Sequence, residues 1–425
     1  MNISRTFKRW LGVLGLAAAT AMLVTACGGG GDSGGSTSTS GGGSGGSSGG
    51  GSNVSDGNTA NTAVITVGPG AARVINIPTV NVKICVPGTS TCQVVNNVLV
   101  DTASYGLRLV SSALTSGVLN GLPQITSGGA PVAECGKFVS SYTWGSLRTV
   151  DLSIGTEQAP ALPVQIIGDL GTANVPASCS NNGARTSANT TGDLGANGIL
   201  GIGPAPLDCG ATCATSTSPT YNNYYACPNG NASCTVALVP TSQQVANPVH
   251  HFATDNNGVI VQMPTVSNSG QGSATGLLTF GIGTQSNNAL GASTQLTSTS
   301  AGDVDATFLG SSVTAFFDTG SNAYFFNDAA QTTCSTNTQF YCPSSTVTYS
   351  ATLTGKNGAS GGVSMPVGNA DALFAAPSTF VYNDIAGPFG PSGWLDLGMP
   401  HFYGKTIYFG MDKTASGGAQ PYVAF

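Results

Sequence analysis

The chain carries one pattern twice, as Val98-Leu99-Val100-Asp101-Thr102-Ala103-Ser104 and as Ala315-Phe316-Phe317-Asp318-Thr319-Gly320-Ser321. In both copies an apolar run of strand character delivers an aspartate into a Thr-x-Ser turn. Two carboxylates that face each other cannot both ionise cheaply, so one keeps its proton while the other can act as a base. The duplicated context therefore predicts one shared acid–base site built from Asp101 and Asp318. The alternative, for each aspartate alone, is an Asx-turn that caps a bend after a strand.

Residues 1–26 have the pattern of a signal peptide, because basic residues precede an apolar stretch that is too short for a transmembrane span. Val24-Thr25-Ala26-Cys27 resembles a bacterial lipobox, which predicts lipidation of Cys27; the alternative is an ordinary signal peptide with an incidental cysteine. Residues 27–62 then form a Gly/Ser-rich tether. Gly28 follows the cysteine, which favours the outer membrane by analogy with bacterial sorting. We expect a lipid-anchored protein of the bacterial cell envelope, on its periplasmic or surface face.

Of the eleven cysteines, ten remain once Cys27 is set aside. An even number behind an export signal favours disulfides. Short turn-rich loops predict the pairs Cys85–Cys92 and Cys334–Cys342, and Cys135–Cys179 is what remains outside one cluster. The four cysteines of that cluster permit three pairings, which stay open. The alternative for the cluster is a zinc site, although the spacings fit no zinc pattern. The cluster contains Cys209, Cys213, Cys227 and Cys234.

The charge pattern excludes several classes of function. Charged residues make up 7% of the chain and the net charge is −6, so no basic patch is available for nucleic acid. The three histidines form no H-E-x-x-H motif and no candidate triad. We therefore expect no metal, no cofactor and no nucleic-acid partner.

From residue 63 onward, short apolar runs rich in β-branched residues are bounded by Gly, Pro, Asn and Ser. Helical i, i+3, i+4 stripes are scarce, and the one helix candidate covers residues 111–119. The sequence therefore predicts an all-β protein. The clearest predicted strands cover residues 63–67, 74–77, 80–85, 94–100, 161–167, 258–263 and 276–282.

Six further segments, in the right order, complete a resemblance of residues 80–425 to the pepsin-like aspartic proteases. The first, Tyr142-Thr143-Trp144-Gly145-Ser146, is similar to that family's flap signature, and the others are residues 197–203, 276–281, 395–402, 407–412 and 421–425. The resemblance implies a bilobed double-ψ β-barrel architecture with a flap hairpin over a central cleft. It also implies an N-terminal lobe over 63–284, with a flap near 138–156 and a Cys-rich insertion at 204–246, and a C-terminal lobe over 285–425.

The same resemblance implies roles for individual residues. Asp101 and Asp318 would be catalytic, and Tyr142 and Trp144 of the flap would contact a substrate. The alternative for Tyr142 is an aromatic side chain packed on its own hairpin. The threonines would lock the two turns together, and the serine and glycine positions would donate hydrogen bonds to the carboxylates. These supporting residues are Thr102, Ser104, Thr319, Gly320 and Ser321.

Two positions depart from the family pattern. Ala103 stands in place of glycine and adds a Cβ beside the expected position of a scissile carbonyl; its backbone is strained only if the turn needs a positive φ. Asp396 stands where the family has an apolar residue. Either a third carboxylate lies near the pair or Asp396 is a solvated or capped turn residue, and both interpretations stay open.

Two classes of function compete. The first is a membrane-tethered pepsin-like aspartic endopeptidase that hydrolyses peptide bonds through Asp101, Asp318 and an activated water. The second is a catalytically inactive lipoprotein of the same fold that binds peptide or glycan, and Ala103 favours it. A scaffold protein of the envelope is a third possibility. The expected partners are a peptide or protein and, through the lipid anchor only, a membrane; we expect a monomer.

Overall fold

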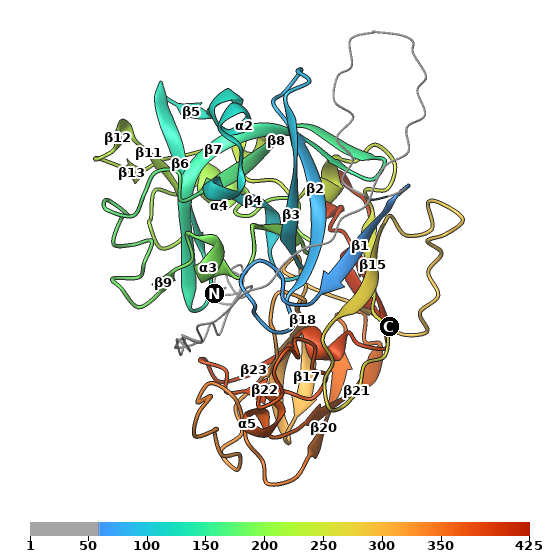
Figure 1. Ribbon diagram of the computed structural model, residues 1–425. Helices are drawn as coiled ribbons and strands as arrows, with labels where there is room; N and C mark the ends of the chain where they lie inside the picture. Colours follow the sequence, from blue (N-terminus) through green and yellow to red (C-terminus); the bar gives the residue numbers. More distant parts are fainter. Residues whose placement is uncertain (1–57, 59) are drawn as a thin grey trace, which may run out of the picture.

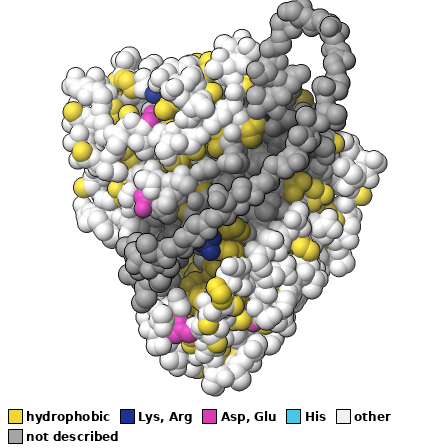
Figure 2. All heavy atoms as spheres, in the orientation of Figure 1, with side chains coloured by type: hydrophobic (Ala, Val, Ile, Leu, Met, Phe, Trp, Pro, Cys, Tyr) yellow, Lys and Arg dark blue, Asp and Glu magenta, His cyan; other side chains and the backbone are white. Residues whose placement is uncertain are grey.

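The computed structural model describes residue 58 and residues 60–425 (Figure 1). The predicted signal peptide, the lipidation site Cys27 and nearly all of the tether lie outside these residues and stay predictions. In the part that the structure describes, strands dominate and no helix is long and apolar enough to cross a membrane. On the face shown in Figure 2, charged side chains are few and scattered, and no basic patch is visible.

The first lobe is built around a closed barrel of six strands. Along the barrel β3 runs parallel to β10 and β4 runs parallel to β8, whereas the other four neighbouring pairs are antiparallel. Both faces of β3 are covered: Val98 and Val100 enter the main core, and Leu99 packs in a separate apolar cluster. In order around the ring the strands are β2 (Pro78–Cys85), β3 (Cys92–Asp101), β10 (Gly198–Ile202), β4 (Tyr105–Val110), β8 (Glu157–Ile167) and β7 (Ser141–Ile154).

The second lobe repeats this plan but does not close. Here β18 runs parallel to β23 and β19 runs parallel to β22, and β18, like β3, leads into an aspartate turn. The fold prediction is therefore confirmed: the protein is all-β and bilobed (Figure 1), with one closed barrel and a second that is nearly closed. In order the strands are β21 (Ser360–Val367), β20 (Val347–Thr354), β17 (Val304–Phe308), β18 (Ser311–Phe317), β23 (Trp394–Leu397), β19 (Tyr324–Phe325) and β22 (Ala386–Gly387).

A six-stranded antiparallel array joins the two ends of the chain. The last two strands return from the second lobe to pair with strands on the other side of it, so the predicted lobe boundary after residue 284 falls within this array. In order its strands are β1 (Thr62–Val67), β15 (Ala274–Phe280), β14 (Gly258–Gln262), β24 (Thr406–Gly410), β25 (Tyr422–Ala424) and β16 (Gln295–Thr297).

The remaining elements are short. The strands are β5 (Thr126–Ser127), β6 (Ala130–Lys137), β9 (Thr186–Ser187), β11 (Tyr224–Ala226), β12 (Pro228–Asn231) and β13 (Thr235–Val236). The α-helices are α2 (Ser116–Gly121), α3 (Thr191–Leu194), α4 (Ala211–Thr215) and α5 (Ala370–Leu373). The 3-10 turns are η1 (Ser111–Ala113), η2 (Thr241–Gln243), η3 (Pro248–His251), η4 (Met399–His401) and η5 (Thr414–Ser416).

Two predicted elements were wrong. The helix predicted over 111–119 is two pieces, η1 and α2, because Leu114 and Thr115 are extended between them. The strand predicted over 74–77 is a turn in which Asn76 has a φ of 52°. The Asn76 side chain donates to the carbonyls of Asn322 and Tyr382 in the second lobe, so contacts distant in sequence override the local strand propensity.

Candidate active site

The two aspartate turns are locked to each other by their threonines. Thr102 Oγ1 donates to the carbonyl of Phe317 at 2.9 Å and accepts from the Thr319 N–H at 3.0 Å. Thr319 Oγ1 donates to the carbonyl of Val100 at 2.7 Å and accepts from the Thr102 N–H at 3.2 Å. Each turn thus satisfies backbone groups of the other, and this fixes their relative position.

Each carboxylate is also held by its own turn. Asp101 Oδ1 accepts from the N–H groups of Ala103 at 2.9 Å and Ser104 at 3.1 Å, and Ser104 Oγ donates to Asp101 Oδ2 at 2.5 Å. Asp318 Oδ1 accepts from the Gly320 N–H at 2.7 Å, and Ser321 Oγ lies 2.9 Å from Asp318 Oδ2. The predicted supporting residues therefore all contact the aspartates or the opposite turn.

The two carboxylates face each other across Gly320. A Cβ added at Gly320 would lie 3.0 Å from Asp101 Oδ1 and 3.0 Å from Asp318 Oδ1, so these oxygens lie within twice that distance of each other. Glycine is required here by this close approach rather than by a left-handed backbone. The structure thus brings together the two aspartates that the sequence paired.

Burial shifts both aspartates in the same direction. It raises the pKa of Asp101, although hydrogen bonds from Ser104, Ala103 and Asp318 oppose the rise. Burial, followed by the nearby charges of Asp101 and Asp396, raises the pKa of Asp318 well above its ordinary value. The pair therefore favours one shared proton rather than two ionised carboxylates.

Ala103 fits its turn without backbone strain. It is not among the described residues that have a positive φ. Its side chain packs with Phe316 and Phe389 in a small apolar cluster that Phe325 and Trp394 extend. The methyl group therefore makes contacts across the two lobes. Because the φ of Ala103 is not positive, an alanine at this position costs no backbone strain.

Asp396 lies beside the pair and is not a solvated turn residue. It is 1% exposed in β23, and its Oδ2 is 2.6 Å from Ser321 Oγ, the same atom that contacts Asp318. Of the two interpretations left open by the sequence, the structure selects the third carboxylate.

The hairpin of β6 and β7 turns at residues 138–140, and Tyr142 is the second residue of β7 after this turn. Both of its edges are paired at this end, β6 with β11 and β7 with β9, and the Cys135–Cys179 disulfide ties β6 to the chain before β9. Extensive buried contacts are typical of stable elements rather than of mobile lids. The lid motion expected of a flap is therefore not supported.

The two predicted flap side chains pack on the Cys-rich insertion. Trp144 is fully buried, its ring meets Tyr225 edge-on at 5.4 Å, and its Nε1 donates to Asn231 at 3.0 Å. It offers no surface to a substrate, so the binding role predicted for Trp144 does not fit its position. Tyr142 lies in the same cluster and is 8% exposed. Its packing matches the alternative interpretation, while its predicted flap role stays a prediction.

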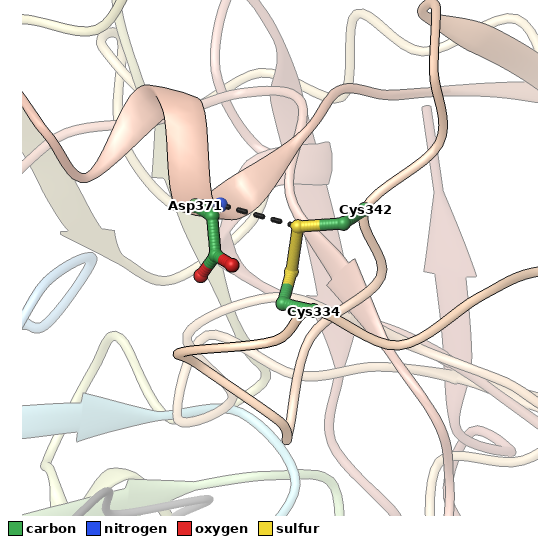
Figure 3. Close-up of side chains that lie close together, drawn as sticks. All are labelled: Cys334, Cys342 and Asp371. Atoms are coloured by element: carbon green, nitrogen blue, oxygen red, sulfur yellow. Dashed lines mark hydrogen bonds between the residues drawn. A yellow bond between two sulfur atoms is a disulfide. The ribbon is translucent and has the colours of Figure 1, made fainter.

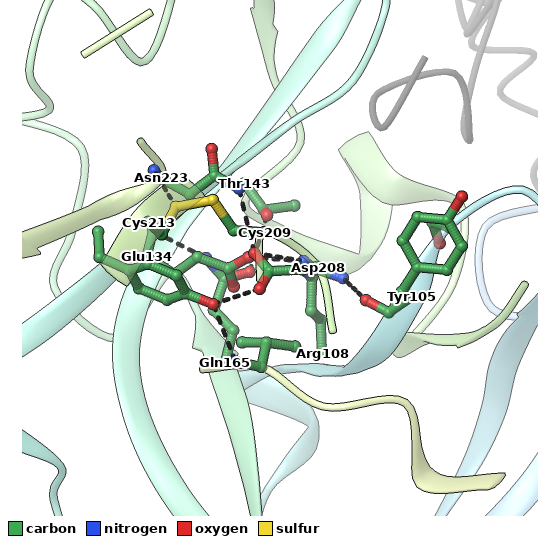
Figure 4. A network of polar contacts seen from close by, with 12 residues as sticks. Tyr105, Arg108, Glu134, Thr143, Gln165, Asp208, Cys209, Cys213 and Asn223 are labelled. Atoms are coloured by element: carbon green, nitrogen blue, oxygen red, sulfur yellow. Dashed lines mark hydrogen bonds and ion pairs between the residues drawn. A yellow bond between two sulfur atoms is a disulfide. The ribbon is translucent and has the colours of Figure 1, made fainter. Parts of the chain in front are cut away.

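Sequence reasoning missed a buried polar network behind this hairpin (Figure 4). Arg108 of β4 donates to Glu134 at 2.5 Å and to the Tyr105 carbonyl at 2.9 Å, and it lies 3.8 Å from Asp208. The Tyr224 hydroxyl donates to Asp208. Burial, together with Asp208, raises the pKa of Glu134 to about 8, although Arg108 opposes the rise. The signal in the sequence was Arg108, the one charged residue in the apolar stretch Tyr105–Val110. A buried cation needs buried acidic partners, so this residue could have indicated the network.

The described residues form five disulfides, and the predicted pairs Cys85–Cys92, Cys334–Cys342 and Cys135–Cys179 are confirmed. The cluster pairs as Cys209–Cys213 and Cys227–Cys234, so its zinc alternative is wrong: no thiolate is left there to bind metal.

Asp371 lies beside the Cys334–Cys342 disulfide (Figure 3). Its N–H contacts Cys342 Sγ at 3.3 Å, and its carboxylate accepts from the N–H groups of residues 335–337. Because the two sulfurs are bonded to each other, this group is a capped turn and not a set of thiolate ligands.

A family model described as a protein of unknown function (DUF3443) matches residues 57–425. A solved aspartic proteinase from Irpex lacteus is similar to this chain at 14% identity and a TM-score of 0.44, with 85% of this chain and 97% of that chain covered. No curated protein matches the chain. The fold follows from the strand pairings above and does not depend on that likeness. Since the family model spans most of its length, the chain belongs to the DUF3443 family of proteins of unknown function.

Proposed function

We propose that this protein is an aspartic endopeptidase that hydrolyses peptide bonds with a water activated by Asp101 and Asp318. The observation that carries the proposal is the facing pair of buried carboxylates, whose turns are locked together by reciprocal threonine hydrogen bonds. Such a pair supplies an acid and a base at one point, which hydrolysis by water requires.

The hydrogen bonds favour a division of roles. Asp101 accepts from three donors of its own turn, whereas Asp318 has two such contacts and a third carboxyl group nearby. Asp101 would therefore be the carboxylate that takes a proton from water, and Asp318 the acid that donates to the carbonyl oxygen of the scissile bond. The substrate class is an extended peptide, bound as an added strand.

A second candidate is a non-catalytic protein that binds peptide or glycan. Two observations favour it: the hairpin near Tyr142 is fastened at both edges, and the Ala103 methyl group occupies a place next to Asp101. A fastened hairpin suits a preformed binding site better than a lid that closes on each substrate.

The proposed setting is the bacterial cell envelope. The protein would be exported, anchored in the outer membrane through Cys27 and a Gly/Ser-rich tether, and monomeric. The proposed reaction needs no cofactor, because water and two carboxyl groups supply the nucleophile, base and acid.

The test is incubation of the full-length protein with a mixed peptide library between pH 3 and pH 7, with and without a pepstatin-like inhibitor. Cleavage that the inhibitor blocks and that the Asp318→Asn variant lacks is the expected result. Peptide binding without cleavage over the whole range would establish the second candidate instead.

A further inference from the structure

The Ser321 hydroxyl lies between two buried carboxyl groups. Its Oγ is 2.9 Å from Asp318 Oδ2 and 2.6 Å from Asp396 Oδ2. A hydroxyl carries one hydrogen, so it donates to only one of these oxygens. The other contact is a hydrogen bond only if that carboxyl group is protonated and donates to Oγ. One of the two carboxyl groups therefore carries a proton on the oxygen that faces Ser321.

The first barrel has no such third group. In β23, Asp396 lies opposite Phe316 of β18. The matching pair of the first barrel is Ile199 of β10 opposite Leu99 of β3, and Ile199 is buried in an apolar cluster. A carboxyl group in place of an isoleucine side chain is costly to bury unless it is hydrogen-bonded, and Ser321 provides that bond.

We propose that Asp396 is a positioning residue that stores a proton for Asp318 and exchanges it through the Ser321 hydroxyl. This inference rests on the proposed peptidase function. At rest Asp318 carries the proton of the aspartate pair on Oδ1, the oxygen on the side of Asp101, while the Asp396 O–H donates to Ser321 Oγ and the serine donates to Asp318 Oδ2. After Asp318 has given its Oδ1 proton to the substrate, the Asp396 proton moves to Ser321 Oγ while the serine's own hydrogen moves to Asp318 Oδ2. Asp396 is then the carboxylate and Asp318 the acid, and the serine is neutral in both states.

The titratable groups around Asp396 favour retention of this proton. Asp318 lies across Ser321, and Asp101 lies beyond Asp318, so ionisation of Asp396 would add a second negative charge to a buried group that already holds the Asp101 carboxylate. His401, which follows β23 in η4, contacts Phe317 on the other face of β18, and burial lowers its pKa, so it stays neutral.

The relay has a consequence for catalysis. After Asp318 gives its proton to the substrate, the stored proton restores the acid without access to solvent. An ionised Asp396 also makes it harder for Asp318 to lose its proton, so activity extends to higher pH than it would with a neutral side chain at this position.

The test compares the full-length wild type with Asp396→Asn and Asp396→Ile. The asparagine keeps a donor for Ser321 but no proton to release, and the isoleucine copies Ile199. Because the folded protein retains a proton that the unfolded chain releases, unfolding free energy falls as pH rises above about 4. In both variants the slope of unfolding free energy against pH is expected to be smaller, by an amount that corresponds to at most one bound proton per molecule. The basic limb of the peptidase pH profile is expected to move down by about 0.5–1 pH unit.

Asp384→Asn is the matched control. Asp384 is a buried carboxyl group of the same lobe whose burial raises its pKa to about 6, and among the described residues it has no hydrogen bond to Asp318 or Ser321. It should alter the pH dependence of unfolding and leave the pH profile of cleavage unchanged.

The outcomes separate this inference from the proposed function. If Asp396→Asn has the wild-type slope of stability against pH and the wild-type pH profile, the relay is overturned while the peptidase stands. If the slope is reduced but no variant cleaves peptide, the stored proton is supported and the peptidase fails. Should Asp396→Ile not fold, Asp396→Asn alone decides.

Discussion

The turns at Asp101 and Asp318 are built alike but have different surroundings. Both use a threonine to hold the opposite turn and a serine to contact their own carboxylate. The first turn places its carboxylate among three donors, and the matching barrel position is an isoleucine. The second has fewer donors and a further carboxyl group at Asp396. The duplicated scaffold thus supplies geometry, and the differences assign the charge to one side and the proton to the other.

The sharpest way to break this comparison is to neutralise one aspartate at a time. Asp101→Asn and Asp318→Asn should each lower kcat/KM by at least about 10³-fold, because the pair supplies both base and acid. Asp318→Asn should also be at least as stable as wild type at pH 7, since it removes a buried group that resists ionisation. Steady-state kinetics and urea denaturation measure the two effects. Residual activity in either folded variant would show that the carboxylates do not work as a pair.

The two turns also differ in the residue after the threonine, which is Ala103 in the first turn and Gly320 in the second. Substituting each residue by the other type tests this difference. Gly320→Ala places a Cβ 3.0 Å from Asp101 Oδ1 and 3.0 Å from Asp318 Oδ1. It should reduce kcat/KM by about 10²-fold, because the added methyl group displaces the two carboxylates. Ala103→Gly should leave cleavage similar or raise it, while losing about 1 kcal/mol of stability through added backbone freedom and lost packing.

Kinetics of both turn variants, with thermal unfolding beside them, decide this prediction. The prediction is that catalysis tolerates a glycine at residue 103 but not a Cβ at residue 320. An inactive Ala103→Gly together with an active Gly320→Ala would contradict it.

The shared part of the two turns predicts equal effects. Thr102→Val and Thr319→Val each remove a donor to the opposite carbonyl and an acceptor for the opposite N–H. Each should cost about 2–4 kcal/mol of unfolding free energy, because buried backbone groups are left without partners. Denaturant titration measures the loss. A difference of several-fold between the two variants would mean that the reciprocal bonds are not equivalent.

The smallest effect concerns the network behind the hairpin, whose anchor Arg108 lies in the first barrel. The pKa of Glu134 is raised from 4.5 to about 8, so the folded state binds a proton that the unfolded state has lost between these values. Unfolding free energy should therefore fall as pH rises from about 5 to 8, and Glu134→Gln should reduce this fall. Denaturation at both pH values, with the exposed Asp305→Asn as control, checks the sign. An unchanged fall would mean that Glu134 is ionised in the folded protein.

Much of the strand content and the pairing of Asp101 with Asp318 could be predicted from the sequence. Both depend on local signals: apolar runs of strand length, turn residues, and a motif that occurs twice in the same context. The disulfides Cys85–Cys92 and Cys334–Cys342 belong to the same class, because their partners lie within one short loop.

Only the tertiary structure decided the surroundings of these elements. Asn76 adopts a turn because its side chain donates hydrogen bonds to carbonyls of the other lobe. Trp144 is buried because the Cys-rich insertion at 204–246 covers it. The Arg108 network and the Ser321–Asp396 contact join residues that are far apart in sequence. Neighbours brought together by strand order determine burial and hydrogen bonding, and these set the protonation of a carboxyl group. A one-dimensional pattern of residue types determines the strands and turns but does not contain these neighbours.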